Sequence, residues 1–478
     1  MIPMVLVATL TLGGVGRSAV PVTQVIADPF TNTTSQHATA VEPDTFAFGD
    51  TMVVAAQVGR FFNGGASGIG VATSTDGGAS WTQSDLPGLT THNGNGGVFD
   101  RVSDPAVAYD PARDVWMVSS LALTTGAVGR AILISRSTDG GLTWGLPVTV
   151  STAGSGQNFD KNWTTCDTHP GSPFIGNCYT TWDDFGDLNR LYTSTSTDGG
   201  LTWGPRLPTG DAATGLGGQP VVQPSGTVVV PVGDPFLRSI LAYRSTDGGA
   251  TWSSTVTVSP VSAHRPAGGL RSLPLPSADV DASGKVYVVW QDCRFRNGCQ
   301  SNDIVMSTSA DGLGWSPVSR VPIDDTRTKV DHFIPGLGID PATSGSTASL
   351  GLTYYFYERS NCGKRCQLEV GYVQSNDGGA TWSSPSDVAG PFPVAWAADT
   401  TQGRMVGDYI STSWVGGKAT AAFAVAESAP SPFDLGIYVP TDGLVPASGA
   451  FVNTSKGEKP VPGAASDHAA QTSAISRR

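Results

Sequence analysis

Charge is scarce in this 478-residue sequence, and positive charge is the scarcer sign. Charged residues make up 14%, with 28 Lys and Arg against 40 Asp and Glu, so the net charge is −12 and the pI is near 4.8. A nucleic-acid partner would require clustered Lys and Arg to contact phosphates, so the composition argues against one. Beyond the first twenty residues no stretch is long and apolar enough to span a membrane, so we expect no transmembrane segment there.

Helical periodicity is also absent, whereas 60 Gly and 33 Pro punctuate short apolar runs. This pattern predicts an all-β protein, with residues 21–454 forming one domain, because repeats in such folds bury their faces against their neighbours. Residues 1–20, "MIPMVLVATLTLGGVGRSAV", are typical of a secretory signal, so we expect a secreted, extracellular monomer. Residues 455–478 are small and polar, which predicts a disordered tail.

Cysteine is limited to six residues, but these are paired along the chain. The pairs are Cys166 with Cys178, Cys293 with Cys299, and Cys362 with Cys366. Close pairs of this kind are typical of an oxidised extracellular protein, and they predict three local disulfides. Zinc would need four convergent Cys or His ligands, and no D-x-[DN]-x-[DN]-G calcium loop is present. We therefore expect neither a metal nor a cofactor.

One short turn sequence occurs six times. "SRSTDGGLTWG" at 135–145 recurs as "STSTDGGLTWG" at 194–204, and shorter copies end at Trp81, Trp252, Trp315 and Trp382. The Asp side chain can accept backbone N–H bonds, Gly-Gly supplies the positive φ that a tight turn needs, and Trp then acts as an apolar plug. Successive copies lie about 50 to 70 residues apart, which fits one four-stranded unit plus variable loops. The turn is therefore predicted to serve folding.

Two apolar strands precede each turn, and the opening and closing segments follow the same plan, which gives seven units. The S-x-D-x-G-x-x-W turns are similar to the Asp boxes of bacterial neuraminidase repeats, so residues 35–440 resemble the sialidase, or neuraminidase, superfamily. The resemblance implies a sialidase-like β-propeller of four-stranded antiparallel blades. Seven blades are favoured by the count of units, and six, the sialidase number, is the alternative. The Phe/Tyr-Arg-Ile-Pro motif of that family is absent.

The topology of such a blade separates two faces. The start of the first strand and the loop after the second strand share one face, whereas the Asp-box turns lie on the other. We predict the ligand site on the face opposite the Asp boxes, where charged residues of a charge-poor chain gather. Those expected there are His37, Arg60, Arg101, Asp104, Asp160, Lys161, Asp183, Asp184, Asp234, Arg271, Asp292, Arg294, Asp331, His332, Glu358, Arg359, Arg404, Asp408 and Tyr409. Each one taken singly could instead be a structural cap or ion pair.

The resemblance implies a glycoside hydrolase of the exo-sialidase type that acts on an acidic sugar of glycans or polysaccharides. Its catalytic residues would be Tyr409 as nucleophile, Glu358 as the base that activates it, and Asp104, with Glu42 as the rival to Glu358. Carboxylate clamps would be Arg271, Arg359 and Arg404, and the remaining substrate-binding residues would be Arg294, Asp331, His332 and Asp408.

Two other functions remain open. A polysaccharide lyase would neutralise a uronate with Arg or Lys and abstract a proton with His or Tyr, and Lys161, His332 and Tyr409 could serve. A non-catalytic propeller would bind a glycan or a surface protein without turnover, because a fold does not determine a function.

Overall fold

The computed structural model describes residues 20–94, 96–429, 432–447, 451–454 and 461, and this part of the chain is all-β. The predicted signal at 1–20 and the predicted tail at 455–478 lie outside the described residues, apart from Val20 and Val461. Helical structure in the described part is limited to single 3-10 turns: η1 (Phe185–Asp187), η2 (Asn297–Cys299), η3 (Gly345–Thr347), η4 (Gly363–Arg365) and η5 (Val394–Trp396). None of these could cross a membrane.

Four antiparallel sheets of four strands form the middle of the chain. They are β10 (Phe159–Cys166), β11 (Cys178–Asp184), β12 (Arg190–Ser196) and β13 (Leu207–Pro208); β14 (Val221–Val222), β15 (Val228–Gly233), β16 (Ser239–Ser245) and β17 (Val256–Pro260); β18 (Ser277–Val280), β19 (Val286–Asp292), β20 (Asp303–Ser309) and β21 (Ser319–Arg320); β22 (Asp331–Ile339), β23 (Leu350–Tyr357), β24 (Gln367–Ser375) and β26 (Ser386–Pro393). Each sheet follows chain order, as successive hairpins dictate.

A twelve-stranded sheet combines the two ends of the chain. It contains β2 (Gln36–Phe48), β3 (Thr51–Arg60), β4 (Ala66–Ser74) and β5 (Thr82–Asp85); β6 (Arg101–Asp110), β7 (Val115–Leu123), β8 (Gly129–Ser137) and β9 (Val148–Thr152); and β29 (Ser411–Val415), β30 (Lys418–Ala426) and β31 (Leu435–Pro440) with β1 (Val22–Ile26). Single residue pairs, Thr39 with Leu435 and Ala66 with Val102, join these three groups. Two short pairs complete the strands: β25 (Thr381–Trp382) with β32 (Val452–Asn453), and β27 (Ala398–Thr400) with β28 (Gly403–Met405).

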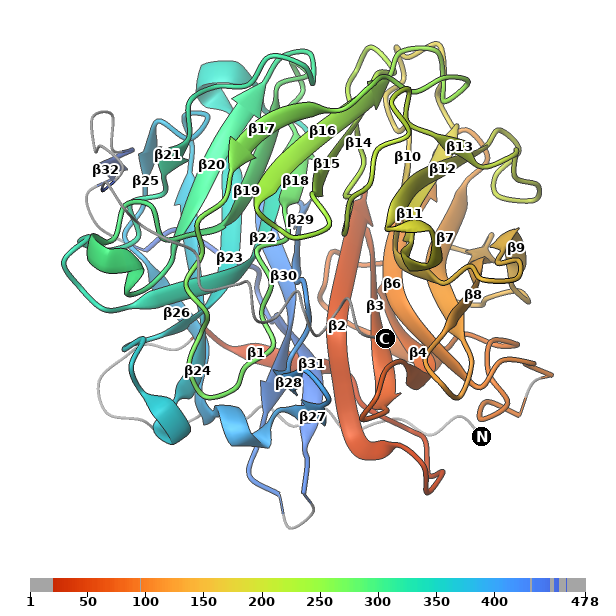
Figure 1. Cartoon of the computed structure of the whole chain (residues 1–478), viewed down its shortest axis with the longest axis horizontal. Helices are drawn as coiled ribbons and strands as arrows, with labels where there is room; N and C mark the ends of the chain where they lie inside the picture. The colour runs from red at the N-terminus through yellow and green to blue at the C-terminus, as the bar shows by residue number, and fades with distance from the viewer. Residues whose placement is uncertain (1–19, 95, 430–431, 448–450, 455–460, 462–478) are drawn as a thin grey trace.

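The first strands of the groups contact one another in a closed cycle. β2 contacts β6, and the contacts continue through β10, β14, β18 and β22 to β29, which contacts β2. Figure 1 shows the colours passing round the molecule in chain order, so that the blue β29–β31 return beside the red β1 and β2. β1 pairs with β31, so strands from opposite ends of the described chain share one group.

Side chains connect neighbouring first strands where backbone pairing between groups is sparse. Asp44 accepts a hydrogen bond from the Val107 backbone N–H at 2.7 Å, and Asp279 accepts one from the Ile339 N–H at 2.7 Å. Burial raises the pKa of each of these carboxyl groups to about 7. Strands that lie between two layers are covered on both faces. β4, for example, is buried along its whole length.

The Asp-box turns have the self-contained geometry that the sequence predicts. In the copy before Trp252, the Asp247 carboxylate accepts the Thr251 backbone N–H at 2.9 Å. The Ser245 hydroxyl donates to Asp247 at 2.8 Å and accepts the Gly249 N–H at 2.9 Å. Gly249 has φ of 85°, a value that an L-residue rarely adopts. The turn follows the third strand, β16, so these turns share one face of the molecule.

The Trp residues that end these turns are buried to very different extents, which corrects the expectation of a uniform plug. Trp382 is fully buried and Trp252 is buried, whereas Trp81, Trp144, Trp203 and Trp315 remain partly exposed. The three local disulfides are confirmed: Cys166–Cys178, Cys293–Cys299 and Cys362–Cys366.

Replacing the buried Trp382 with Ala is expected to cost about 3–5 kcal/mol of unfolding free energy, because a large buried side chain leaves a cavity. Trp203→Ala is the matched control, and its cost should be clearly smaller because its side chain is already partly in water. Denaturant unfolding followed by circular dichroism measures both. Equal losses in the two variants would show that Trp burial does not determine how strongly the turns stabilise the fold.

Candidate active site at the axis of the strand ring

Three neighbouring first strands contain the same irregularity. The pairing register shifts between Val41 and Asp44 in β2, between Ser103 and Ala106 in β6, and between Asp160 and Trp163 in β10. Inside these bulges Glu42, Asp104 and Lys161 have φ of 58°, 48° and 50°. Bulges re-aim side chains, and left-handed backbone at residues other than Gly persists only where its surroundings enforce it. The three bulges bring three charged side chains to one place.

Lys161 is the centre of the resulting cluster. Its Nζ lies 3.3 Å from Glu42 Oε1 and 3.4 Å from Asp104 Oδ1, and it also donates to Asp408 Oδ2. All four residues are buried. These carboxylates outweigh the cost of burying the ammonium group, so the pKa of Lys161 is held well above its usual value. Lys161 therefore stays protonated.

Arg271 extends the cluster from the other side of Asp408. Its Nε donates to Asp408 Oδ1 at 2.6 Å, and its Nη2 donates to Asp408 Oδ2. Arg271 and Lys161 lower the pKa of Asp408 despite its burial, so this carboxylate remains ionised. Asp408 is therefore the fixed anion that holds both cations.

Glu42 has a different electrostatic environment. It accepts hydrogen bonds from the Gln57 side-chain amide and from the Asp408 backbone N–H, the latter at 3.3 Å. Burial raises its pKa to about 7, an effect that Lys161 opposes and that Asp104 and Asp408 reinforce. Near neutral pH Glu42 can therefore gain or lose a proton, as a general acid or base must. Burial also raises the pKa values of Asp104 and Asp160.

A pocket of about 110 Å³ opens above this cluster. Its charged lining residues are Glu42, Arg60, Asp104, Asp160, Lys161 and Arg271, and its rim includes residues 62–65 and 400–402. Residues 61–65 join the second strand β3 to the third strand β4, so the pocket lies on the face opposite the Asp-box turns. We call it the axial pocket.

The axial pocket and its cluster combine some of the residues expected from the sequence. Asp104 and Arg271 line the pocket. Asp408 is not among the lining residues, but it holds Arg271 through an ion pair. Tyr409 lies deeper, beside a cavity of about 20 Å³ that Lys161 also borders. The Tyr409 hydroxyl donates to the Pro105 carbonyl at 3.1 Å, and its ring packs edge-on against Trp163. Burial raises the pKa of Tyr409 well above its usual value.

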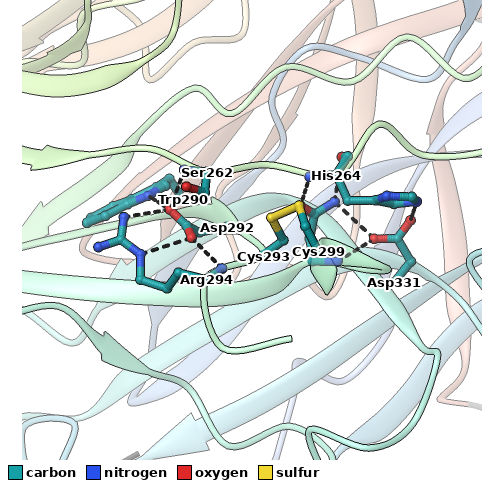
Figure 2. The surroundings of a disulfide bond; sticks show 9 residues. Ser262, His264, Trp290, Asp292, Cys293, Arg294, Cys299 and Asp331 are labelled. Atoms are coloured by element: carbon teal, nitrogen blue, oxygen red, sulfur yellow. Dashed lines mark hydrogen bonds and ion pairs between the residues drawn. A yellow bond between two sulfur atoms is a disulfide. The ribbon is translucent and has the colours of Figure 1, made fainter. Parts of the chain in front are cut away.

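Other expected site residues lie away from the axial pocket, on either side of the Cys293–Cys299 disulfide (Figure 2). Arg294 Nε donates to Asp292 at 2.9 Å, and Arg294 also donates to the Ser259 hydroxyl at 3.0 Å. Asp331 accepts hydrogen bonds from the Asn302 backbone and side chain at 2.8 and 2.9 Å, and lies 3.7 Å from His264 Nε2. The Cys293–Cys299 disulfide closes the loop that contains Arg294, and Arg294 forms an ion pair with Asp292 there.

His332 belongs to a separate buried cluster between two sheets. Its Nδ1 lies 3.2 Å from the Asn302 carbonyl oxygen, and desolvation lowers its pKa. Ligand atoms of Asp303, Asp324 and His332 lie within 4.8 Å of one another. Arg296 donates to both carboxylates at 2.5 Å, so these acids already have a cationic partner.

Glu358, Arg359 and Arg404 are not among the residues that line the axial pocket. Glu358 and Arg359 follow the end of β23 and are exposed. Arg404, in β28, donates to the Ala397 carbonyl at 3.1 Å and lies 3.9 Å from Asp399. Instead of the expected Glu358, the carboxyl groups of Glu42 and Asp104 lie near Tyr409, and their charges add to the effect of burial in raising the pKa of Tyr409.

Two members of the site were given little or no weight from sequence. Arg60 was expected on this face without a role, and Gln57 was not identified. Gln57 links Arg60 to Glu42: its Oε1 accepts from Arg60 Nη1 at 2.9 Å while its amide donates to Glu42. Both residues lie in β3, where the nearly continuous apolar run "MVVAAQVGR" indicates only a buried strand, so no local signal identifies Gln57.

Comparison with known proteins finds one family match, in the middle of the chain. Residues 125–336 match the family model described as a BNR repeat-like domain. The predicted resemblance to BNR repeats is thus confirmed for these residues, which make up less than half of the chain. No curated protein matches the sequence significantly.

Several solved structures are similar at low identity. One is the intramolecular trans-sialidase from Ruminococcus gnavus, with 14% identity and a TM-score of 0.47 over 71% of this chain and 95% of that chain. A Dyadobacter fermentans protein of unknown function has 16% identity and a TM-score of 0.47 over 74% and 99%. The α-L-arabinofuranosidase Arb93A from Fusarium graminearum has 16% identity and a TM-score of 0.43 over 74% and 98%.

Removal of the central cation should destabilise the whole fold. Lys161→Met leaves Glu42, Asp104 and Asp408 without their shared partner, and breaking such a buried pair costs about 3–5 kcal/mol. Lys418→Met is the control, because Lys418 is exposed and should change unfolding free energy by less than about 0.5 kcal/mol. Denaturant unfolding measures both. A Lys161→Met protein as stable as the parent would contradict the role of this cluster.

Stability should fall as pH rises from about 5 to 8. Glu42, Asp44, Asp279 and Asp331 each have a pKa of about 7 in the folded protein, raised by burial, so the folded state binds protons that the unfolded state has lost. Burial lowers the pKa of His332, which by itself would make stability rise with pH. This single histidine is outweighed by the four carboxyl groups. The urea midpoint should be higher at pH 5 than at pH 8, and a higher midpoint at pH 8 would contradict these assignments.

Proposed function

We propose that the protein is a secreted, sialidase-like glycoside hydrolase that acts on an acidic sugar in the axial pocket of a seven-bladed propeller. The proposal rests on the pocket's own chemistry. Cations and carboxyl groups with raised pKa values line one small cavity, and both are required for the hydrolysis of a glycoside whose sugar carries a carboxylate.

The strongest support for an acidic substrate is that two arginines, Arg60 and Arg271, line the same pocket and each has side-chain N–H groups that bond no other residue of the described chain. Arg60 uses Nη1 to bond Gln57 and the Gly65 carbonyl, and Arg271 uses Nε and Nη2 to bond Asp408. In the described part of the chain, buried Arg60 Nε has no hydrogen-bond partner, and the hydrogen bonds of the two arginines leave Arg60 Nη2 and Arg271 Nη1 unused. Burial lowers the pKa of Arg60 to about 10, and the charge of Arg271 contributes. A substrate carboxylate between these groups would relieve their repulsion.

Glu42 is the proposed proton donor to the leaving oxygen. It lines the pocket, and its pKa of about 7 keeps a substantial protonated fraction at neutral pH. Asp104 and Asp160 line the same pocket and supply the second carboxyl group that glycosidases use, as nucleophile or base. The resemblance led us to expect Tyr409 as the nucleophile. In this scheme Tyr409 would not react, and would instead pack beside Lys161 and help to position the charged cluster.

The geometry favours hydrolysis over the lyase alternative. A lyase base must be neutral before it accepts a proton, but the surrounding carboxylates keep Lys161 protonated. His332 lies in a different cluster. A new double bond absorbing near 235 nm, or binding without turnover, would replace the hydrolase proposal with the lyase or the binding function.

Glu42→Gln is expected to reduce turnover of an acidic-sugar aryl glycoside by at least about 100-fold, because proton donation contributes 10²–10⁴-fold in such enzymes. The matched control is Glu358→Gln, which alters an exposed glutamate outside the pocket and should retain activity. The parent should lose kcat/KM as pH rises through about 7, since the raised pKa keeps Glu42 protonated only below that value. Loss of activity in Glu358→Gln with retention in Glu42→Gln would reverse the assignment.

Arg60→Gln should raise KM for the acidic substrate by about 10-fold or more, because a charge-assisted hydrogen bond contributes about 1.5–3 kcal/mol. The methyl ester of the same substrate lacks the carboxylate charge, so its KM should change little in this variant. Steady-state kinetics on the acid and ester pair measure the difference. An equal change in both values of KM would show that Arg60 does not contact the carboxylate.

A further inference from the structure

A second pocket, of about 460 Å³, opens at the other end of the axis, on the face that carries the Asp-box turns. First strands from around the ring line it, through residues such as Phe48, Val107, Thr165, Val221, Asp279, Ile339 and Ser413. Exposed residues at its mouth, among them Gly49, Pro170, Pro341 and Gly416, show that it is open to solvent. Its volume is within the range of about 300–1,000 Å³ typical of small-molecule sites. We call it the Asp-box-side pocket.

The charge of this pocket is unlike that of the axial pocket. Its lining residues include no Lys or Arg, so it offers no permanently charged cation to an anionic ligand. Asp44 and Asp279 are already hydrogen-bonded to backbone N–H groups of neighbouring strands. Because burial raises the pKa of each to about 7, these two acids contribute little negative charge under mildly acidic conditions. The lining also includes Asp340, which accepts the Ala342 backbone N–H at 3.0 Å, and His169, whose Nε2 lies 2.8 Å from the Val222 carbonyl oxygen. An uncharged ligand suits this lining.

Three polar groups in the pocket are available for such a ligand. Thr165 and Thr168 are half-buried, and the described chain provides no hydrogen-bond partner for either side-chain hydroxyl. Gln219 has its Oε1 fixed by the Ala278 backbone N–H at 2.7 Å, which sets the orientation of its amide. The Nε2 group of Gln219 likewise has no partner in the described chain. Two hydroxyls and one amide donor therefore remain for hydroxyl groups of a ligand.

Aromatic rings lie beside these polar groups. Phe48 is 41% exposed at the mouth, and its ring is held against Tyr109 with a centroid separation of 4.6 Å. Trp163 is half-buried deeper in the pocket and packs edge-on against Tyr409. Pre-positioned aromatic faces combined with a few oriented polar groups are the features of sites that bind compact ligands with both apolar and hydroxyl-bearing surfaces.

We propose that the Asp-box-side pocket is a binding site for an uncharged saccharide unit. The sugar would place C–H groups on Phe48 or Trp163 and hydroxyls toward Thr165, Thr168 and Gln219. Trp163 and Tyr409 separate this pocket from the axial pocket, so the site is independent of the proposed hydrolase activity. It would bind uncharged sugar, whereas the two arginines of the axial pocket would bind a carboxylate.

The test is direct binding of uncharged probes to the intact 478-residue chain. The methyl glycosides of glucose, galactose and N-acetylglucosamine, at millimolar concentration, are monitored by saturation-transfer NMR and by tryptophan fluorescence. At least one is expected to bind, and glucuronic acid should not compete with it. If no uncharged glycoside binds, or if the cation spermidine binds this pocket in preference, the proposal is wrong.

Two variants locate the binding. Thr165→Val removes only a hydroxyl and should weaken binding by about fivefold or more, in line with the loss of one hydrogen bond. Phe48→Ala should weaken it at least as much. Phe236→Ala is the control, since Phe236 is 56% exposed and lines neither pocket, and it should bind as the parent does. Unchanged affinity in both pocket variants would overturn the assignment, with thermal unfolding used to confirm that each is folded.

Discussion

The buried ammonium group of Lys161 is the interaction on which the centre of this protein depends. A buried charge is tolerated only when opposite charges compensate it, and here the compensation comes from different parts of the ring: Glu42 in β2, Asp104 in β6 and Asp408 just before β29. With the group that contains Lys161 itself, four strand groups must therefore meet at one point with correct register. The bulges that place Glu42, Asp104 and Lys161 in left-handed backbone are stabilised by this meeting.

The same electrostatic arrangement gives the face its chemistry. Asp408 binds Lys161 and Arg271 together and stays ionised, so its charge is used internally. Glu42 has a raised pKa and can exchange a proton, while Arg60 and Arg271 retain donors toward the pocket. One carboxylate holds the cations in place, and another has a pKa near neutrality. In the proposed hydrolase, the structural core and the reactive groups would share a single cluster.

Local features could be predicted from the sequence, and features that depend on several repeats could not. The Asp-box turn is closed by bonds within seven residues, as in Ser245 to Thr251, so its sequence specifies its geometry. The disulfides connect residues at most 12 apart and were equally predictable. The grouping of strands into repeating four-stranded units follows from these turns, together with the alternation of apolar runs.

The site was predicted only in part because its geometry depends on bulges and on distant contacts. Asp104 and Arg271 were expected at the pocket from their places relative to first strands, and they line it. Glu358 was selected by its order along the chain, but order does not determine which side of a strand end a residue occupies, and it is exposed. Glu42, named from the sequence only as the rival to Glu358, reaches the axis through a bulge that contains no glycine, so no turn signal marks its place.

The central claim, that Arg60 and Arg271 form the carboxylate site of an acidic sugar, is tested most directly by a crystal structure of the protein soaked with N-acetylneuraminic acid or glucuronic acid. The account predicts the sugar in the axial pocket, with its carboxylate oxygens within hydrogen-bond distance of both guanidinium groups and its glycosidic oxygen position toward Glu42. An axial pocket that contains only water at saturating sugar, or a sugar bound with its carboxylate directed away from both arginines, would contradict it.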